Sequence, residues 1–103
     1  MTSPPLQRSV VVRNPEGLHA RPADRLVRTA GAYASDIAVV RDGQRVDGKS
    51  ILSLLTLGAT QGTELSIEVD GEDAPEAMAA LVELFESGFD EDAEAASTPN
   101  PGP

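Results

Sequence analysis

The pattern of apolar and polar residues predicts four strands in this chain. Residues 64–70 alternate strictly, with aliphatic side chains on one side and acidic or hydroxyl side chains on the other. This alternation is typical of a strand with one face in the core and one in water. Two further strands are joined by Asp42-Gly43, a strong signal for a two-residue hairpin. The predicted strands cover residues 6–13, 36–41, 44–47 and 64–70.

Apolar residues at helical spacing predict three helices. The first has Pro22 early, where the missing N–H of a proline costs nothing. In the second, Ser50 is a good N-cap and the short segment that follows is mostly aliphatic. The third has Asp73 as its expected capping residue and Glu76 three residues later, which resembles a capping box. The helices are expected to start at Ala20, Ser50 and Asp73 and to stop near Gly31, Gly58 and Gly88.

The resulting order of elements, β-α-β-β-α-β-α, indicates a two-layer α+β domain. We expect a four-stranded antiparallel sheet covered on one face by three helices. The chain has 103 residues, of which 40% are hydrophobic and 3% aromatic, so one small domain with an aliphatic core is expected. The domain is placed at residues 6–90, after an N-terminal extension of residues 1–5. Residues 91–103 are acidic and proline-rich, and we expect a disordered tail there.

The charges are distributed unevenly and argue against several classes of protein. The chain has 8 basic and 17 acidic residues and a net charge of −9, so no binding to nucleic acid is expected. All 8 basic residues precede residue 50, and the first half is therefore the more positive one. The absence of cysteine and the single histidine argue against disulfides and the usual zinc sites. No stretch is long and apolar enough to span a bilayer. We therefore expect a cytoplasmic protein without membrane insertion.

The most specific chemistry lies in residues 17–23, GLHARPA, at the start of the first predicted helix. His19 falls at the helix N-terminus, where backbone N–H groups and the helix dipole favour an anion. Arg21 adds a guanidinium that can bind phosphate oxygens. A neutral imidazole there can carry a phosphoryl group without a metal or a cofactor. The alternative is that His19 only caps the helix and Arg21 is an ordinary surface charge. The residues expected to build the anion site around His19 are Gly17, Leu18, Ala20 and Pro22.

The segments GLHARPA and DGKSILSLLTLGATQGTEL resemble the HPr phosphocarriers of the phosphoenolpyruvate-dependent phosphotransferase system, over about residues 7 to 90. The resemblance implies an open-faced β-sandwich with the order of elements given above. It implies that Nδ1 of His19 takes a phosphoryl group from phosphorylated enzyme I and passes it to an enzyme IIA domain, as a stoichiometric carrier and not as an enzyme. Arg21 matches the family arginine that steadies the phosphoryl group, and Pro22 the proline that opens the helix.

Ser50 matches the serine that an ATP-dependent HPr kinase/phosphorylase modifies in many members of that family. A phosphate there meets a helix N-terminus favourably, so its effect is expected on partners and not on the fold. Two other interpretations remain open. The segment LFESGFDED is similar to the ending of nitrogen-branch phosphocarriers, which regulate with the same chemistry. A signalling module controlled by Ser50 would instead leave His19 idle.

The surface near His19 is expected to dock protein partners, with the chain acting as a monomer. The second helix is too apolar to bury every side chain, so Leu52 and Leu55 are expected to be partly exposed while Leu54 faces the sheet. Arginines along the first helix form either an ordinary solvated face or a surface that steers acidic partners. The predicted docking residues are Arg25, Arg28, Lys49, Ile51, Leu52 and Leu55.

Glu16 departs from the family pattern, because many members carry Asn or Ser at this position. A carboxylate close to a phosphohistidine is unfavourable by like-charge repulsion. We therefore expect Glu16 either to point away from His19 or to make the phosphohistidine more labile.

Overall fold

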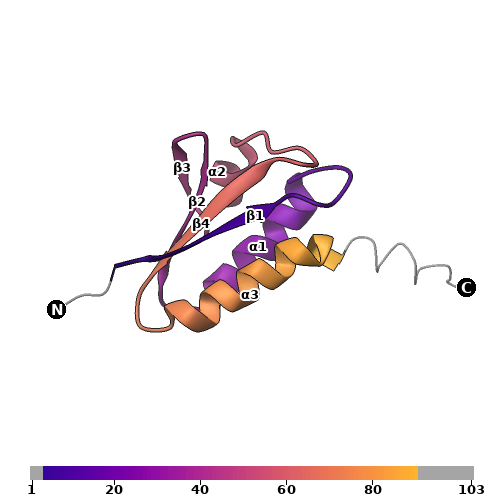
Figure 1. The fold of residues 1–103 in the computed structure, drawn as a ribbon. Coiled ribbons are helices and arrows are strands. Elements are labelled where there is room, and N and C mark those ends of the chain that lie inside the picture. The colour runs from indigo at the N-terminus through magenta and orange to yellow at the C-terminus, as the bar shows by residue number, and fades with distance from the viewer. Residues whose placement is uncertain (1–3, 91–103) are drawn as a thin grey trace, which may run out of the picture.

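Four antiparallel strands form one sheet with the spatial order β1-β4-β2-β3 in the computed structural model (Figure 1). The structure describes residues 4–90. The predicted tail, residues 91–103, and the first three residues lie outside this range. The strands are β1 (Leu6–Val11), β2 (Asp36–Arg41), β3 (Gln44–Asp47) and β4 (Glu64–Asp70). The helices are α1 (Ala20–Gly31), α2 (Ile51–Leu55) and α3 (Ala74–Glu86), followed by a 3-10 turn at Gly88–Asp90.

The three helices cover one face of this sheet, which confirms the predicted α+β class and the open-faced sandwich. α1 and α3 lie side by side beneath the strands, and α2 lies close to β3 (Figure 1). The other face carries the polar residues of β4, where Arg45 of β3 pairs with Glu68. The β1–α1 and β4–α3 connections lie at opposite ends of the molecule (Figure 1).

The core follows the pattern that the sequence predicts. In β4, Leu65, Ile67 and Val69 are buried, whereas the two residues between them are partly exposed and the two ends of the strand are exposed. Phe89, beyond the predicted end of the last helix, is also buried and packs edge-to-face against Phe85 with ring centroids 4.8 Å apart. Aliphatic side chains from all three helices complete the core. The Asp42-Gly43 hairpin is confirmed, since both residues have positive φ, as this tight turn requires.

Two predicted elements are longer than the observed ones. β1 ends at Val11 and not at residue 13. Val12 still donates to the Thr63 carbonyl and accepts from the Gly62 N–H, but these bonds belong to the turn before β4 and not to the regular ladder. α2 ends at Leu55, since the following residues close into tight backbone turns.

Asp73 stands at the N-terminus of α3, but the prediction that its side chain caps this helix is wrong. Its carboxylate instead accepts hydrogen bonds from the Ser35 hydroxyl at 2.5 Å, the Ala34 N–H at 2.8 Å and the Ser35 N–H at 3.0 Å. These bonds favour the ionised form, and the Ser35 hydroxyl in particular lowers the pKa of Asp73. Asp73 therefore joins the α1–β2 connection to the β4–α3 connection.

A membrane-spanning helix would have to be longer and more apolar than any helix within residues 4–90.

Candidate functional site

His19 is the N-cap of α1, as the sequence predicts. Its backbone is extended, with φ −85° and ψ −169°, and its carbonyl accepts the first helical bond from the Ala23 N–H at 3.0 Å. The Nδ1 atom faces the helix and accepts from the Arg21 N–H at 3.4 Å. One ring nitrogen therefore already lies at the positive end of α1, where an anion is favoured. The His19 side chain is 36% exposed, so the imidazole ring is accessible from solvent.

A network of backbone bonds holds the loop before His19. The Leu18 N–H donates to the Ala59 carbonyl at 2.9 Å, and the Gly17 N–H donates to the Asn14 carbonyl at 3.1 Å. The buried amide of Asn14 closes the turn by donating to the Gly17 carbonyl at 2.5 Å. Gly17 and Leu18 were predicted to belong to the anion site around His19, and in the structure their N–H groups donate to backbone carbonyls that hold the loop. The Leu18 side chain is buried, and the helix end itself is left to Ala20 and the residues that follow it.

Gly17 is needed in this loop for two reasons. Its φ is +77°, in the left-handed region that favours glycine. A Cβ atom at this position would lie 2.6 Å from the Ala59 carbonyl oxygen, which is backbone and cannot rotate away. The loop that presents His19 therefore packs directly on the segment that follows α2.

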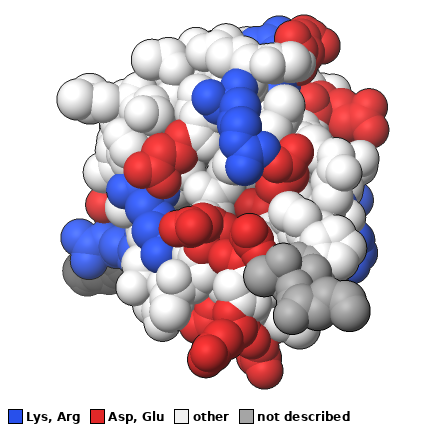
Figure 2. Space-filling model, turned by 90° about the vertical axis from the view of Figure 1, so that its left-hand side faces the viewer, with Lys and Arg blue, Asp and Glu red and all other residues white. Residues whose placement is uncertain are grey.

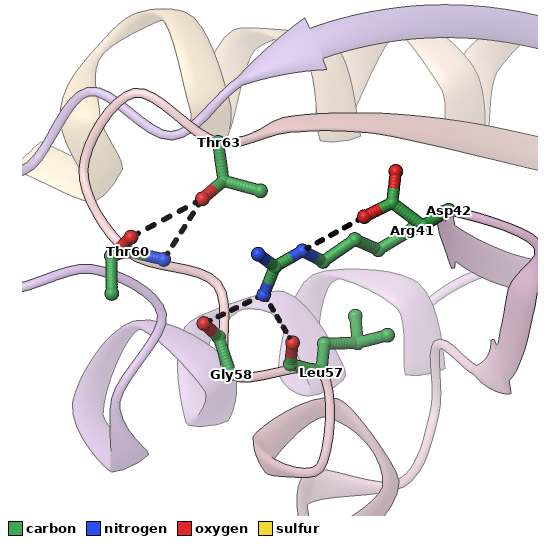
Figure 3. Close-up of polar contacts among 6 residues, drawn as sticks. All are labelled: Arg41, Asp42, Leu57, Gly58, Thr60 and Thr63. Carbon is green, nitrogen blue, oxygen red and sulfur yellow. Dashed lines mark hydrogen bonds and ion pairs between the residues drawn. The ribbon is translucent and has the colours of Figure 1, made fainter.

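Arg41 holds this supporting segment in place (Figure 3). Its guanidinium, from the end of β2, donates to the carbonyls of Leu57 at 2.7 Å and Gly58 at 2.8 Å. Thr63 then closes the turn by accepting from the Thr60 N–H at 3.1 Å. The Ala59 carbonyl lies between these two fixed points and receives the Leu18 N–H. The helix α2 and the His19 loop are thus tied to the same short stretch of chain.

Glu16 does not point away from His19, so the first of the two expectations for this residue is wrong. Its Oε1 atom lies 3.6 Å from Nε2 of His19. The contact is therefore on the side of the ring opposite Nδ1. The Glu16 side chain is 78% exposed, whereas Nε2 itself is enclosed by the protein.

The arginines of α1 differ in their surroundings. Arg21 is exposed at the helix start, two residues after His19, and Arg25 is half-buried one turn later. Arg28 pairs with Asp24 on the same helix, with Nε and Oδ2 2.8 Å apart. The charge of Arg28 is therefore partly offset within the helix, and Arg21 is the arginine closest to His19 along the chain.

The helix α2 presents the apolar surface that was predicted from its composition. Leu54 is fully buried, Leu52 is 78% exposed and Leu55 is 37% exposed. Ile51 is half-buried and packs against the core at the edge of this surface. Lys49, another predicted docking residue, donates from its ammonium to the Tyr33 carbonyl at 2.9 Å in a partly buried bond. We call Leu52, Leu55 and Ile51 the α2 patch.

Ser50 is the N-cap of α2, as predicted, and its hydroxyl oxygen accepts from the Ser53 N–H at 3.2 Å. The residue is partly exposed. A cap of this kind stabilises a helix by about 1 kcal/mol. The Ser50 hydroxyl therefore stabilises α2 whether or not the residue is ever modified.

A group of acidic residues lies at the end of the molecule opposite the His19 loop. Asp70, Glu72, Asp73 and Glu76 follow one another where β4 passes into α3. Figure 2 faces this end of the molecule and shows Asp and Glu side chains across its centre and lower part. The described residues contain no cluster of three or more His, Cys, Asp or Glu that could hold a metal ion.

Sequence reasoning missed three positions that shape the site. Asn14 has no signal in the sequence beyond that of an ordinary turn residue, yet its buried amide holds the loop. Ala59 contributes through its carbonyl, which no side-chain pattern can reveal. Arg41 resembles any charged residue at a strand end, and only the fold brings it to the end of α2.

Comparison with known proteins agrees with this geometry. Residues 6–87 match the family described as "PTS HPr component phosphorylation site". Phosphocarrier protein HPr of Xylella fastidiosa (strain 9a5c) is 42% identical over 87 residues, which cover 84% of this chain and 98% of that protein. Phosphocarrier protein HPr of Neisseria meningitidis serogroup A is 41% identical over 86 residues, which cover 84% and 97%.

Solved structures show the same fold. HPr from Thermoanaerobacter tengcongensis superposes with a TM-score of 0.81 at 41% identity, covering 84% of this chain and 97% of the other. The Bacillus subtilis protein Crh, described as a dimer with a swapping domain, superposes with a TM-score of 0.67 at 37% identity, covering 81% and 95%. The fold and the histidine at its helix N-terminus thus define a small phosphocarrier domain. Since the matches span most of its length, the chain belongs to the HPr family of the phosphotransferase system.

Proposed function

We propose that this protein relays a phosphoryl group from phosphorylated enzyme I to an enzyme IIA domain through Nδ1 of His19. The observation that carries the proposal is the position of Nδ1 at the N-terminus of α1, 3.4 Å from the Arg21 N–H. In the first step the Nδ1 lone pair attacks phosphorus, so that an N–P bond forms as the N–P bond of the donor histidine breaks. In the second step the acceptor's nucleophile takes the phosphoryl group and Nδ1 regains its lone pair.

The residues around His19 support such a relay. The helix end and the Arg21 guanidinium offer positive potential to a phosphoryl dianion. The Asn14 amide and the close packing of Gly17 on Ala59 support the loop that carries the imidazole. In this proposal the protein acts as a stoichiometric carrier without a cofactor, and it acts in the cytoplasm.

Docking is assigned to the surface beside the histidine. The α2 patch offers exposed aliphatic side chains, and Arg21 and Arg25 offer positive charge. A combination of an apolar patch and nearby cations fits acidic partner surfaces, since charge speeds encounter while apolar contact slows release.

Ser50 is proposed as a regulatory phosphorylation site for an HPr kinase/phosphorylase. Its oxygen already lies at the start of α2, where a phosphate would add charge next to the α2 patch without opposing the helix. The added negative charge would repel acidic partners and slow the reaction of His19.

The experiment is incubation with enzyme I, phosphoenolpyruvate and Mg²⁺. The protein should gain a phosphate that is labile in acid and stable in base, and the His19→Ala variant should gain none. Ser50→Ala serves as the matched control, because it removes the other proposed phosphorylation site and should label like the wild type. Retention of the label by His19→Ala would disprove the relay.

A further inference from the structure

The contact between Glu16 and His19 has a chemical consequence beyond the relay itself. Oε1 of Glu16 lies 3.6 Å from Nε2, while Nδ1 accepts from the Arg21 N–H on the other side of the ring. A neutral imidazole carries one proton, and the partner of each ring nitrogen decides which nitrogen holds it. A donor at Nδ1 and a carboxylate at Nε2 both favour the proton on Nε2.

We propose that Glu16 is a positioning residue for phosphoryl transfer. It favours the Nε2–H form of the His19 imidazole before transfer, and it offsets the positive charge that the ring gains when Nδ1 bonds phosphorus. This inference rests on the proposed function. The Nε2–H form is the one whose Nδ1 carries the in-plane lone pair, which accepts from the Arg21 N–H in the resting protein and must turn to phosphorus for attack. The role resembles that of the carboxylate behind a catalytic histidine, which orients the ring and stabilises the imidazolium.

The charge balance of the reaction explains why a carboxylate is useful there. When Nδ1 forms its bond to phosphorus, both ring nitrogens are substituted and the ring becomes positive. The proton stays on Nε2, and the Glu16 carboxylate lies next to it. The negative charge therefore stabilises the ring as the N–P bond forms.

The same contact affects the phosphorylated state. A phosphorylated imidazole is a better leaving group when its second nitrogen carries a proton than when it does not. The Glu16 carboxylate beside Nε2 favours the proton there, so the phosphoryl group is easier to lose than from a ring without this carboxylate. The carboxylate and the phosphoryl group lie at opposite nitrogens of the ring, which limits their repulsion. Because Glu16 is 78% exposed, the effect is that of a solvent-screened pair, about two- to fivefold.

The first test uses the unphosphorylated protein and ¹⁵N NMR of the His19 ring in its neutral range. The wild type should be mainly in the Nε2–H form. Glu16→Ala should shift the ratio of the two tautomers toward Nδ1–H by about two- to fivefold, with an unchanged amide spectrum elsewhere. Glu76→Ala, at the start of α3 and far from the site, should leave the ratio unchanged. An equal ratio in Glu16→Ala and the wild type would overturn the proposal.

The second test phosphorylates the histidine with phosphoramidate and follows loss of phosphate at neutral pH by ³¹P NMR. Glu16→Gln, which keeps the shape and removes the charge, should lose phosphate about two- to fivefold more slowly than the wild type and Glu76→Gln. Equal or faster loss in Glu16→Gln would contradict the role of the charge. Neither test uses enzyme I, so failure of the relay and failure of this inference give different results.

Discussion

At the scale of single residues, Gly17 and Gly43 show two different reasons why a position requires glycine. One reason is the strain of a left-handed backbone, and the other is a collision of a Cβ atom with neighbouring backbone. Both have positive φ, +77° and +84°. A Cβ at Gly43 would meet open space, whereas one at Gly17 would collide with the backbone of Ala59. Comparing alanine substitutions at Gly17 and Gly43 therefore measures the effect of the close contact between the His19 loop and Ala59.

Gly43→Ala should lose about 1–2 kcal/mol of unfolding free energy, because only the left-handed backbone is strained. Gly17→Ala should lose more, about 2–4 kcal/mol, because the loop must also move away from the Ala59 carbonyl. Urea unfolding measures both values, and phosphorylation by enzyme I should slow in Gly17→Ala alone. Equal stability of the two variants would show that the contact with Ala59 is unimportant.

Asp73 makes the stability of the protein depend on pH. Hydrogen bonds from the Ser35 hydroxyl and the Ala34 N–H lower the pKa of its carboxyl in the folded state. A lowered pKa means that the stabilisation is complete above the ordinary carboxyl pKa of about 3.9, and is lost as the pH falls through the lower folded value.

Asp73→Asn should thus be less stable than the wild type at neutral pH, and its unfolding free energy should fall less between about pH 5 and about pH 2. Thermal unfolding across this range measures the difference. Asp70→Asn, three residues earlier at the end of β4, is the control and should keep the acid dependence of the wild type. A parallel pH dependence of Asp73→Asn and the wild type would argue against this assignment.

At the scale of elements, local pattern predicted most boundaries, because alternation and turn residues are local properties. The strands at 36–41, 44–47 and 64–70 have the predicted bounds. Asp73 was misassigned because its partners, Ala34 and Ser35, are nearly forty residues away in the sequence. α2 is shorter than its pattern, since the turns that end it depend on residues brought in by the fold.

The helix α2 offers a matched pair of leucines. Leu54→Ala should cost about 2–5 kcal/mol of unfolding free energy, because the side chain is fully buried and a cavity would remain. Leu52→Ala should change stability by no more than about 0.5 kcal/mol, since this side chain is 78% exposed.

In function, the exposed leucine should matter although it contributes little to stability. Leu52→Ala should raise the KM of enzyme I for this protein several-fold, because the α2 patch is the proposed docking surface. Steady-state phosphorylation assays on folded protein measure this effect. An unchanged KM in Leu52→Ala would remove Leu52 from the docking surface.

At the scale of the whole molecule, the position of the site was predictable while its support was not. The GLHARPA motif places His19 at the start of a helix by local rules alone. The support comes from distant segments, in which Arg41 fixes the end of α2 and the Ala59 carbonyl receives the Leu18 N–H. The approach of Glu16 to Nε2 also depends on the turn that Asn14 closes, which a linear pattern does not describe.

We predict that the protein is a monomer in solution. The edge strands of the sheet are β1 and β3, and β3 is a poor template for pairing because it has only four residues and an exposed Arg45. Light scattering should give the mass of one chain at micromolar concentration. A dimer mass would instead indicate an assembly of the kind described for Crh from Bacillus subtilis.

The most direct test of the central claim is to locate the phosphate on the ring. The protein is labelled with ¹⁵N, phosphorylated by enzyme I and phosphoenolpyruvate, and studied by ³¹P–¹⁵N correlation. The structure predicts one phosphate coupled to Nδ1 of His19, the nitrogen that faces the Arg21 N–H. A phosphate on Nε2, or on a residue other than His19, would contradict the account.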